Sequence, residues 1–304
     1  MFKSLLMVIV ALSLLVVCLP VQAAEKKFRA WTDPADAAHN PDFKVQGEYK
    51  GDGVGYQVIA LHKGRFTVVK CEGGLPGDGF NGKKQETADV DAAKVREIVG
   101  GAKHVVRESS TLGAKAPEGA MVLFDGTFAP FQGHWRDDNR MTAGGLLCEG
   151  ALTKDTFGSF TLHLEFRLPY MPEARGQARG NSGLYMQGRY ELQMLDSFGL
   201  AGMDNECGGI YKISRPAVNM CYPPLNWQTY DIDLTAAKFD ASGKKIADTV
   251  VTIRHNGVVI HDHLALPGPT PGGVNNNEQA PGPIFLQNHG NPVRYRNIWI
   301  TKKD

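Results

Sequence analysis

The chain has 304 residues, with 33 basic and 32 acidic side chains and a formal net charge of +1 at pH 7. Because the charges nearly cancel, nothing in the composition points to a nucleic acid or an anionic membrane surface as a partner. The 35 glycines and 17 prolines, together with the scarcity of charged helix-forming runs, indicate many short strands joined by turns.

The first residues have the pattern of a secretory signal peptide. Lys3 supplies a positive start, residues 5–17 form an apolar run, and Val21-Gln22-Ala23 is an acceptable small-residue cleavage site. We therefore predict removal of residues 1–23 and export to the periplasm or the extracellular space, with no membrane attachment after cleavage. A retained N-terminal anchor is the alternative, although the apolar run is short for a membrane span.

Export would place the remaining cysteines in an oxidising compartment, where some can pair. Cys207 and Cys221 are close in sequence and flank a turn-rich segment, which makes them the best candidates for a disulfide. Their spacing resembles no zinc motif, and histidines at suitable offsets are missing.

Residues 24–116 are predicted to form a small β-rich accessory unit and its linker. Strand patterns recur between residues 43 and 70. The glycine-rich stretch 73–79 lacks the Lys-Ser/Thr ending of a phosphate-binding loop, so we interpret it as a turn. Residues 111–119, rich in Ala, Gly and Pro, mark the linker. No catalytic constellation occurs in this unit, which favours a binding or packing role.

Residues 117–304 have a more regular strand pattern. The cleanest strand is predicted over 160–168, where apolar side chains alternate with Thr161, His163, Glu165 and Arg167. One face of this strand must be core, and the other is either plain solvent or a polar groove. Many further short strands with turns at regular spacing predict an antiparallel sandwich.

The stretch NSGLYMQGRYELQMLD, residues 181–196, is predicted to form a hairpin. Gly188-Arg189 would supply a type II′ turn, because glycine suits its first central position. On the returning strand, the apolar face contains Tyr190, Leu192 and Met194, and the polar face contains Glu191 and Gln193.

Asp196 does not follow the alternation of this strand. A β-bulge between Gln193 and Asp196 would return its carboxylate to the face of Glu191. Two carboxylates and an amide would then line one surface, which is the minimum set for cutting a glycosidic bond.

Several segments of the second domain resemble the 3-keto-disaccharide hydrolase domain family, and they occur in the family's order over residues 121–302. They are LFDG at Leu123, FTLHLEFRL, NSGLYMQGRYELQMLD, CGGIY at Cys207, NWQTYDI at Asn226, RHNGVVI at Arg254 and PIFLQNHGNPVRYRNIWI. The resemblance implies an all-β, concanavalin A-like jelly-roll sandwich with a concave substrate face. It also implies cleavage of 3-keto-disaccharides or 3-keto-glucosides, which an upstream glycoside 3-dehydrogenase would supply.

The segment ELQMLD is also similar to the catalytic strand of bacterial laminarinases and lichenases, which use Glu-x-Asp-x-x-Glu. Here the pattern is Glu191-x-Gln193-x-x-Asp196. An amide replaces the middle Asp, and Asp196 is shorter than Glu, so both departures argue against a simple retaining mechanism.

Two mechanisms remain open for these residues. An ordinary glycosidase would use Glu191 and Asp196 as its carboxylate pair. The family implies instead that a base removes the C2 proton beside a C3 ketone, the leaving sugar departs from C1, and water adds to the enone. For this route we expect Glu191 as the base and His289 or Asp196 as the acid, and Glu165 could join the acid/base group.

Further polar residues are candidates for substrate binding. Arg167 or Arg296 would hold the enolate or sugar hydroxyls, and the candidate sugar contacts are Asn181, Tyr190, Gln193, Tyr211 and Gln287. The sequence requires no cofactor. A divalent metal would need His163, Glu165, Glu191 and His289 to converge, and no ligand spacing supports this. A β-glucan-type glycosidase and a non-catalytic, lectin-like carbohydrate-binding module remain as alternatives, since a sandwich fold alone does not define function.

Overall fold

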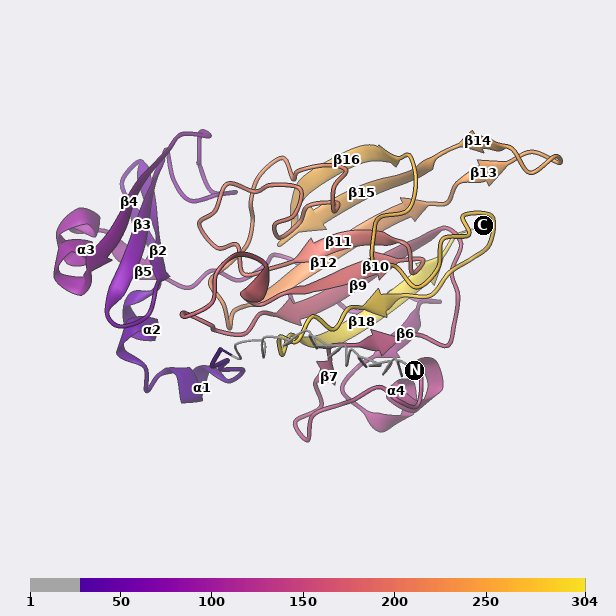
Figure 1. Ribbon diagram of the computed structural model, residues 1–304, viewed down its shortest axis with the longest axis horizontal. Coiled ribbons are helices and arrows are strands. Elements are labelled where there is room, and N and C mark those ends of the chain that lie inside the picture. The colour runs from indigo at the N-terminus through magenta and orange to yellow at the C-terminus, as the bar shows by residue number, and fades with distance from the viewer. Residues whose placement is uncertain (1–27, 304) are drawn as a thin grey trace, which may run out of the picture.

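The computed structural model describes residues 28–303, which form a small N-terminal sheet unit beside a larger β-sandwich (Figure 1). The expected signal peptide, residues 1–23, lies outside the described residues. Within residues 28–303, no helix combines the length and the apolar character needed to cross a membrane.

The N-terminal unit is a five-stranded antiparallel sheet with the order β4-β3-β2-β1-β5. The strands are β1 (Gly47–Gly51), β2 (Val54–Ala60), β3 (Arg65–Glu72), β4 (Lys84–Asp91) and β5 (Lys103–Val105), and the helices are α1 (Pro34–Ala37), α2 (Pro41–Val45) and α3 (Ala92–Val99). The strand expected from residue 43 begins later, because Asn40 caps the preceding helix by accepting a hydrogen bond from Asp42 N, and Pro41 occupies its first turn.

The second unit is a sandwich of two antiparallel sheets, which confirms the predicted all-β class. The seven-stranded sheet has the order β16-β15-β12-β9-β18-β6, and β7 also pairs with β18. Its strands are β6 (Met121–Phe124), β7 (Leu147–Cys148), β9 (Phe160–Arg167), β12 (Trp227–Thr235), β15 (Thr249–His255), β16 (Val258–Leu266) and β18 (Arg294–Lys302).

The four-stranded sheet has the order β11-β10-β17-β8. Its strands are β8 (Ala151–Leu152), β10 (Ser182–Met186), β11 (Tyr190–Met194) and β17 (Phe285–Leu286). A separate hairpin pairs β13 (Lys238–Phe239) with β14 (Lys245–Ala247), and the helical segments are α4 (Phe128–His134) and the 3₁₀ turn η1 (Gly176–Ala178).

The main core lies between the two sheets and follows the period-two alternation of the strands. The apolar face predicted for residues 160–168 is completely buried, and it belongs to the same cluster as Leu184, Leu192 and Met194 of the other sheet. The polar side chains of β10 and β11 therefore point away from this core, which is the condition for a polar site on the four-stranded sheet.

The two units also share buried surface. Ile59 and Val69 of the N-terminal sheet belong to the core cluster of the sandwich, and Tyr170 and Leu225 of the sandwich pack in the core of the N-terminal unit. Gly199 has no room for a side chain, since a Cβ there would lie 2.5 Å from Ile59 Cδ1. The N-terminal unit is thus packed against the sandwich.

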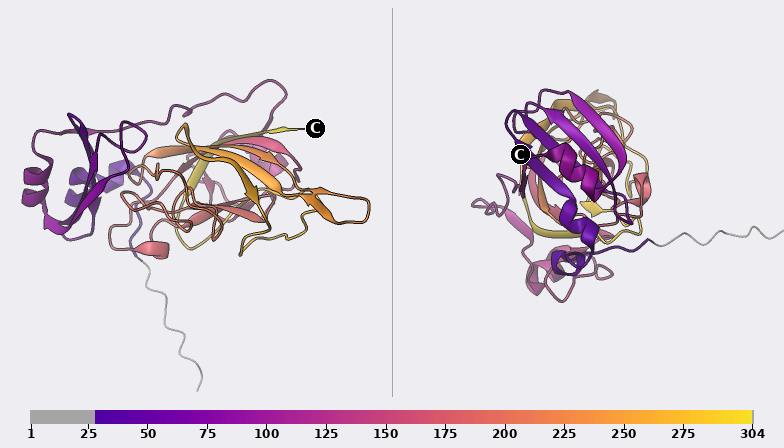
Figure 2. Two further views of the ribbon diagram at one scale, coloured as in Figure 1. Left: turned by 90° about the horizontal axis from the view of Figure 1, so that it is seen from above. Right: turned by 90° about the vertical axis from the view of Figure 1, so that its left-hand side faces the viewer.

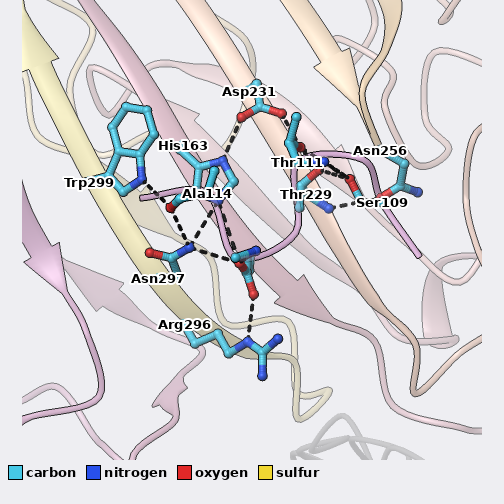
Figure 3. Close-up of polar contacts among 12 residues, drawn as sticks. Ser109, Thr111, Ala114, His163, Thr229, Asp231, Asn256, Arg296, Asn297 and Trp299 are labelled. Carbon is cyan, nitrogen blue, oxygen red and sulfur yellow. Dashed lines mark hydrogen bonds and ion pairs between the residues drawn. The ribbon is translucent and has the colours of Figure 1, made fainter. Parts of the chain in front are cut away.

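The connection between the units, residues 107–116, is held against the outer face of the seven-stranded sheet (Figures 2 and 3). Ser109 Oγ lies 2.6 Å from Thr229 Oγ1, Thr111 Oγ1 donates to Asp231 at 2.7 Å, and Gly113 N donates to Glu165 at 2.6 Å. A stretch whose composition predicts a linker is therefore a strap with specific partners.

The four cysteines in the described part of the chain are buried, free thiols. Cys207 and Cys221 are not joined, so the expected disulfide is absent, and Cys221 Sγ donates instead to Leu195 O at 3.5 Å. Cys207 Sγ also lies 3.3 Å from the hydroxyl of Tyr230, which in turn donates to Gln193 O at 2.8 Å.

Candidate active site

The hairpin of β10 and β11 positions the candidate site. Its loop contains three residues, and Gln187 and Gly188 have positive φ angles of 52° and 67°. Arg189 N donates to Met186 O at 3.1 Å, which closes a turn with Gln187 and Gly188 at its centre. Two central residues with positive φ are the requirement of a type I′ turn, so the expected II′ turn at Gly188-Arg189 is displaced by one residue.

This loop sets the register of the hairpin. Tyr185 lies opposite Glu191, and Gly183 lies opposite Gln193. Because facing residues of an antiparallel pair project from the same side of a sheet, these side chains gather on the polar face.

A pocket of about 150 Å³ opens on this face. It is lined by Gln177, Asn181, Tyr185, Glu191, Gln193, Tyr211, Pro271, Gly272, Gln287 and His289. Six of the residues singled out from the sequence meet here, and they are Asn181, Glu191, Gln193, Tyr211, Gln287 and His289.

Glu191 provides the pocket's carboxylate. Its buried environment stabilises the protonated carboxyl relative to the same group in water. The residue is 3% exposed, and burial raises the pKa of its carboxyl to about 7. Tyr185 Oη donates to Glu191 Oε2 at 2.8 Å, which opposes the rise in pKa only in part. A carboxyl that titrates near neutrality can accept and release a proton under physiological conditions.

Gly183 leaves the space that Glu191 occupies. A Cβ at this position would lie 2.4 Å from Glu191 Oε1 and 3.0 Å from its Cγ. The glycine therefore allows the carboxylate to lie directly against β10, and any larger residue would displace it.

Two amide oxygens in the pocket have no hydrogen-bond partner in the described part of the chain. They are Asn181 Oδ1 and Gln287 Oε1, and both atoms are buried. Asn181 Nδ2 is held by Gln177 O at 2.8 Å, and Gln287 Nε2 donates to Tyr185 Oη at 3.3 Å. Oriented but unpaired acceptors fit the hydroxyl donors of a sugar, because such a ligand would satisfy their hydrogen-bonding capacity.

His289 and Tyr211 border the pocket where it meets solvent. His289 is exposed, and Tyr211 is half-buried with its backbone N donating to Glu191 O at 3.1 Å. His289 is thus placed to exchange a proton with both solvent and a bound molecule, which suits a general acid.

Asp196 does not join Glu191, which corrects the expectation of a carboxylate pair. Its Oδ2 accepts from Arg179 Nε at 2.6 Å, and its side chain is 1% exposed. β11 ends at Met194, so no bulge returns Asp196 to the polar face, and the residue instead lines a second cavity next to the N-terminal unit.

Tyr190 was expected to contact sugar, but it lies in the core between the sheets. Its hydroxyl donates to Glu278 Oε1 at 2.5 Å and lies 3.0 Å from Thr249 Oγ1. The strict alternation of β11 accounts for this correction, because Tyr190 lies on the face opposite that of Glu191.

Arg296 lies on the outer face of the other sheet, near the strap (Figure 3), and Glu165 joins the two, because it accepts hydrogen bonds from Arg296 Nε and from Gly113 N of the strap. Glu165 Oε2 accepts from Arg296 Nε at 2.6 Å, and Oε1 accepts from Asn297 at 2.9 Å. Burial alone would raise the pKa of Glu165, but the ion pair with His163 at 3.8 Å and the hydrogen bonds from Asn297, Arg296 and Gly113 N outweigh it and hold the pKa at about 2. This carboxylate is therefore ionised at neutral pH and fully paired, unlike a catalytic base.

Arg167 is also outside the pocket. Its Nη2 donates to Thr32 O at 2.7 Å. The guanidinium groups of Arg167 and Arg296 lie over the ring of Trp227, at 4.9 Å and 4.0 Å from its centroid. The expectation that Glu165, Arg167 and Arg296 meet a substrate with Glu191 is corrected, because the two groups lie on different sheets.

Four residues that line the pocket were not predicted from the sequence, and they are Gln177, Tyr185, Pro271 and Gly272. Tyr185 follows from the hairpin register once the loop is counted as three residues. Gln177 lies in the 3₁₀ turn η1, so no strand pattern indicates it. Among residues 28–303, no group of three or more His, Cys, Asp and Glu side chains is arranged to hold a metal ion.

Comparison with known protein families assigns the class. The family model described as a 3-keto-alpha-glucoside-1,2-lyase-like domain matches residues 119–301, more than half of the chain. The chain therefore belongs to this family, and the resemblance predicted from the sequence motifs is confirmed.

A solved structure from Parabacteroides distasonis ATCC 8503, described as a "putative glycosyl hydrolase", is 33% identical to this chain, with a TM-score of 0.55. The match covers 62% of this chain and 85% of that one. Together with the family, it supports a glycoside hydrolase-like function.

Two further structures from the same organism carry the same description and are more distant. One is 17% identical with a TM-score of 0.42 and covers 66% of this chain and 99% of the other, and the second is 19% identical with a TM-score of 0.36 and covers 54% and 90%. No match was found among curated proteins.

Proposed function

We propose that this protein cleaves the glycosidic bond of 3-keto-glucosides, 3-keto-disaccharides among them, by elimination followed by hydration. The observation that carries this proposal is the composition of the pocket. Its only lining carboxylate among the described residues is Glu191, whose pKa is raised to about 7. An elimination needs one positioned base, and the family's description as 1,2-lyase-like names the same kind of step.

The reaction begins at C2 of the oxidised sugar. Glu191 in its carboxylate form takes the C2 proton, whose acidity the neighbouring C3 ketone increases, and the C–H electrons form the C2=C3 enolate. The enolate then re-forms the ketone while the C1–O bond breaks, which leaves a C1=C2 double bond. His289 protonates the departing oxygen. Water adds to C1 and a proton returns to C2, so that the net reaction is hydrolysis.

The remaining pocket residues bind the substrate and stabilise the charge that develops on it. The hydroxyl of Tyr185, which contacts Glu191, is the donor closest to the base and can turn toward the C3 oxygen. Asn181 and Gln287 supply free acceptors for sugar hydroxyls, and Gln193 and Tyr211 complete the lining. No step in this route requires a cofactor.

The alternatives have weaker support from the site. An ordinary retaining or inverting glycosidase uses two carboxyl groups that flank the scissile bond, and Asp196 is occupied by Arg179 outside the pocket. A lectin-like module would not need a buried carboxyl that titrates near neutrality, since its binding groups can keep ordinary pKa values.

The discriminating experiment is a parallel incubation with 3-keto-trehalose and trehalose, with and without a chelator. We expect cleavage of the ketone and none of the parent sugar, with no loss of rate on chelation. Comparable turnover of both sugars would contradict the proposal and favour an ordinary glycosidase. Binding without turnover, in which Glu191→Gln leaves affinity unchanged, would favour the lectin-like module.

The cellular context follows from the same proposal. Signal-peptide cleavage and export would place the protein in the periplasm or outside the cell. The substrate would come from a glycoside 3-dehydrogenase, because the C3 ketone must exist before the C2 proton can be removed. Neither nucleic acid nor a membrane is a proposed partner.

A further inference from the structure

A second cavity, of about 290 Å³, lies between the N-terminal sheet and the sandwich. Its walls come from both units, with Ile59, Leu61 and Val69 on one side and Phe198 and Leu200 on the other. No residue of the Glu191 pocket lines it. The volume is near the lower limit of small-molecule sites, and the apolar walls suit a single ring system.

One buried cation on the wall of this cavity has unused hydrogen-bonding capacity. Arg179 is 4% exposed, its Nε donates to Asp196 at 2.6 Å, and its Nη1 donates to Ala60 O at 3.2 Å. Its Nη2 is buried without a partner in the described part of the chain. A guanidinium nitrogen left unpaired costs stability unless a ligand supplies an acceptor.

The charges around the cavity balance. The charged side chains that line it are Arg175, Arg179, Asp196 and Glu86, which are two groups of each sign. The guanidinium of Arg175 is occupied by backbone carbonyls, among them Leu61 O at 2.9 Å. Balanced charges give no net attraction for an ionised ligand, which favours a neutral acceptor oxygen.

From the apolar walls, the unpaired Nη2 and the balanced charge, we infer that this cavity is a binding site for a small, uncharged, apolar ring compound with a carbonyl or hydroxyl oxygen. The ring packs between Ile59 and Phe198, and its oxygen accepts from Arg179 Nη2. The site does not depend on the proposed catalytic function, because the two pockets share no residue.

The N-terminal unit thereby acquires a binding role, which is one of the two roles, binding or packing, that its sequence favours. It supplies one wall of a ligand site, and the sandwich supplies the other. Residues 175–181 separate the two sites, since Arg175, Gly176 and Arg179 line this cavity while Gln177 and Asn181 line the Glu191 pocket.

Saturation-transfer NMR and calorimetry on the whole protein test this inference, with acetophenone as the probe. Ethylbenzene is the matched compound without oxygen, and benzoate is the charged one. We expect acetophenone to bind, ethylbenzene to bind about fivefold more weakly for lack of the hydrogen bond, and benzoate to bind less tightly than acetophenone.

Two tryptophan variants locate the site. Thr67 lines the cavity and is half-buried, so Thr67→Trp would fill the space and lower the affinity for acetophenone at least about tenfold. Gln85 is exposed on the neighbouring strand outside the lining, and Gln85→Trp would leave the affinity unchanged. Arg179→Lys keeps a positive charge beside Asp196 but removes Nη2, and it would abolish the preference for acetophenone over ethylbenzene.

Several results would overturn the inference. They are absence of acetophenone binding, tighter binding of benzoate, unchanged affinity in a folded Thr67→Trp protein, and equal losses in the two tryptophan variants. Thermal melting of each variant confirms that the protein used for binding is folded. If Arg179→Lys fails to fold, the preference between acetophenone and ethylbenzene in the wild-type protein still decides the role of the acceptor oxygen.

Discussion

Two buried glutamates on opposite sheets of this sandwich have opposite electrostatic properties. Glu191 is 3% exposed and Glu165 is 1% exposed, yet the pKa of the first is raised to about 7 and that of the second is lowered to about 2. Burial alone raises the pKa of any carboxyl. The difference comes from the partners. Within residues 28–303, the Glu191 carboxyl has only the Tyr185 hydroxyl, whereas Glu165 has Arg296, Asn297, His163 and the N–H of Gly113.

This contrast separates the proposed catalytic base, Glu191, from a structural carboxylate, Glu165. Glu165 joins the strap to the seven-stranded sheet, and its negative charge is used fully in those contacts (Figure 3). Glu191 borders an open pocket, and its Oε1 accepts no hydrogen bond from the part of the chain that the structure describes. A carboxylate with free capacity beside a cavity is the better candidate for chemistry, even though both residues look equivalent on the polar faces of their strands.

The largest expected effect is the loss of catalytic rate in the Glu191→Gln variant. General-base catalysis contributes about 10²- to 10⁴-fold, so kcat/KM on 3-keto-trehalose would fall by that factor while the fold is retained. Steady-state kinetics and circular dichroism measure the two properties. A folded variant with wild-type kcat/KM would remove Glu191 from the mechanism.

The matched change Glu165→Gln should affect stability instead of rate. Loss of the charge leaves Arg296 without its carboxylate, but the Arg296 side chain is 38% exposed and water compensates part of the loss, so we expect a cost of about 1 kcal/mol in the free energy of unfolding. Because the folded-state pKa is lowered, this contribution is present above about pH 4.5 and is lost as the pH falls toward 2. Urea unfolding at pH 7 and pH 3 checks both statements, and a loss of kcat/KM without a loss of stability would contradict them.

Gly183→Ala tests the placement of Glu191. The added Cβ would lie only 2.4 Å from Glu191 Oε1, which is too close for a non-bonded contact, so the carboxylate must move. Displacement of a catalytic group by about 1 Å costs about 10²-fold, and we expect a loss of that order in kcat with a smaller change in KM. Gly53→Ala is the control, because a Cβ at Gly53 would meet no atom within 4 Å. The φ of 62° at this position is strained for alanine. This control should reduce stability alone, and equal activity of both variants would argue against the assigned geometry.

The smallest expected effect is a shift of the pH profile. Glu191 acts as a carboxylate, so kcat/KM should rise with pH through a midpoint near 7. Tyr185→Phe removes the hydrogen bond that lowers this pKa, so the midpoint would move upward. Loss of the proposed enolate donor would lower the rate at every pH, so the midpoint, and not the rate at one pH, is the quantity to compare. A midpoint that is the same in both proteins would mean that another group controls the profile.

Much of this architecture could be predicted from the sequence. The alternation in residues 160–168 and 190–194 identified the core faces correctly, because burial between two sheets requires a period of two. Glu191 and Gln193 were placed on the polar face for the same reason. The family motifs then indicated the sandwich and the class of reaction.

Other features depend on contacts that no local pattern records. Asp196 lies in an ion pair with Arg179, from an irregular segment, and strand alternation cannot show such a partner. Glu165 and Glu191 have the same local signature, and only the strap and β18 distinguish them. The turn was misplaced by one residue because Gln187 adopts a positive φ of 52°, which is uncommon for a residue other than glycine.

The central claim is that Glu191 removes the proton at C2, and isotope incorporation tests it most directly. 3-Keto-trehalose would be cleaved in D₂O with rapid quenching, and the C2 position of the released 3-keto-glucose would be read by mass spectrometry and NMR. Free 3-keto-glucose held in the same buffer without enzyme measures spontaneous exchange. The account predicts one deuterium at C2 in the enzymatic product beyond that background. A product that retains its original C2 hydrogen would show that the bond breaks without proton removal, and it would contradict the elimination route.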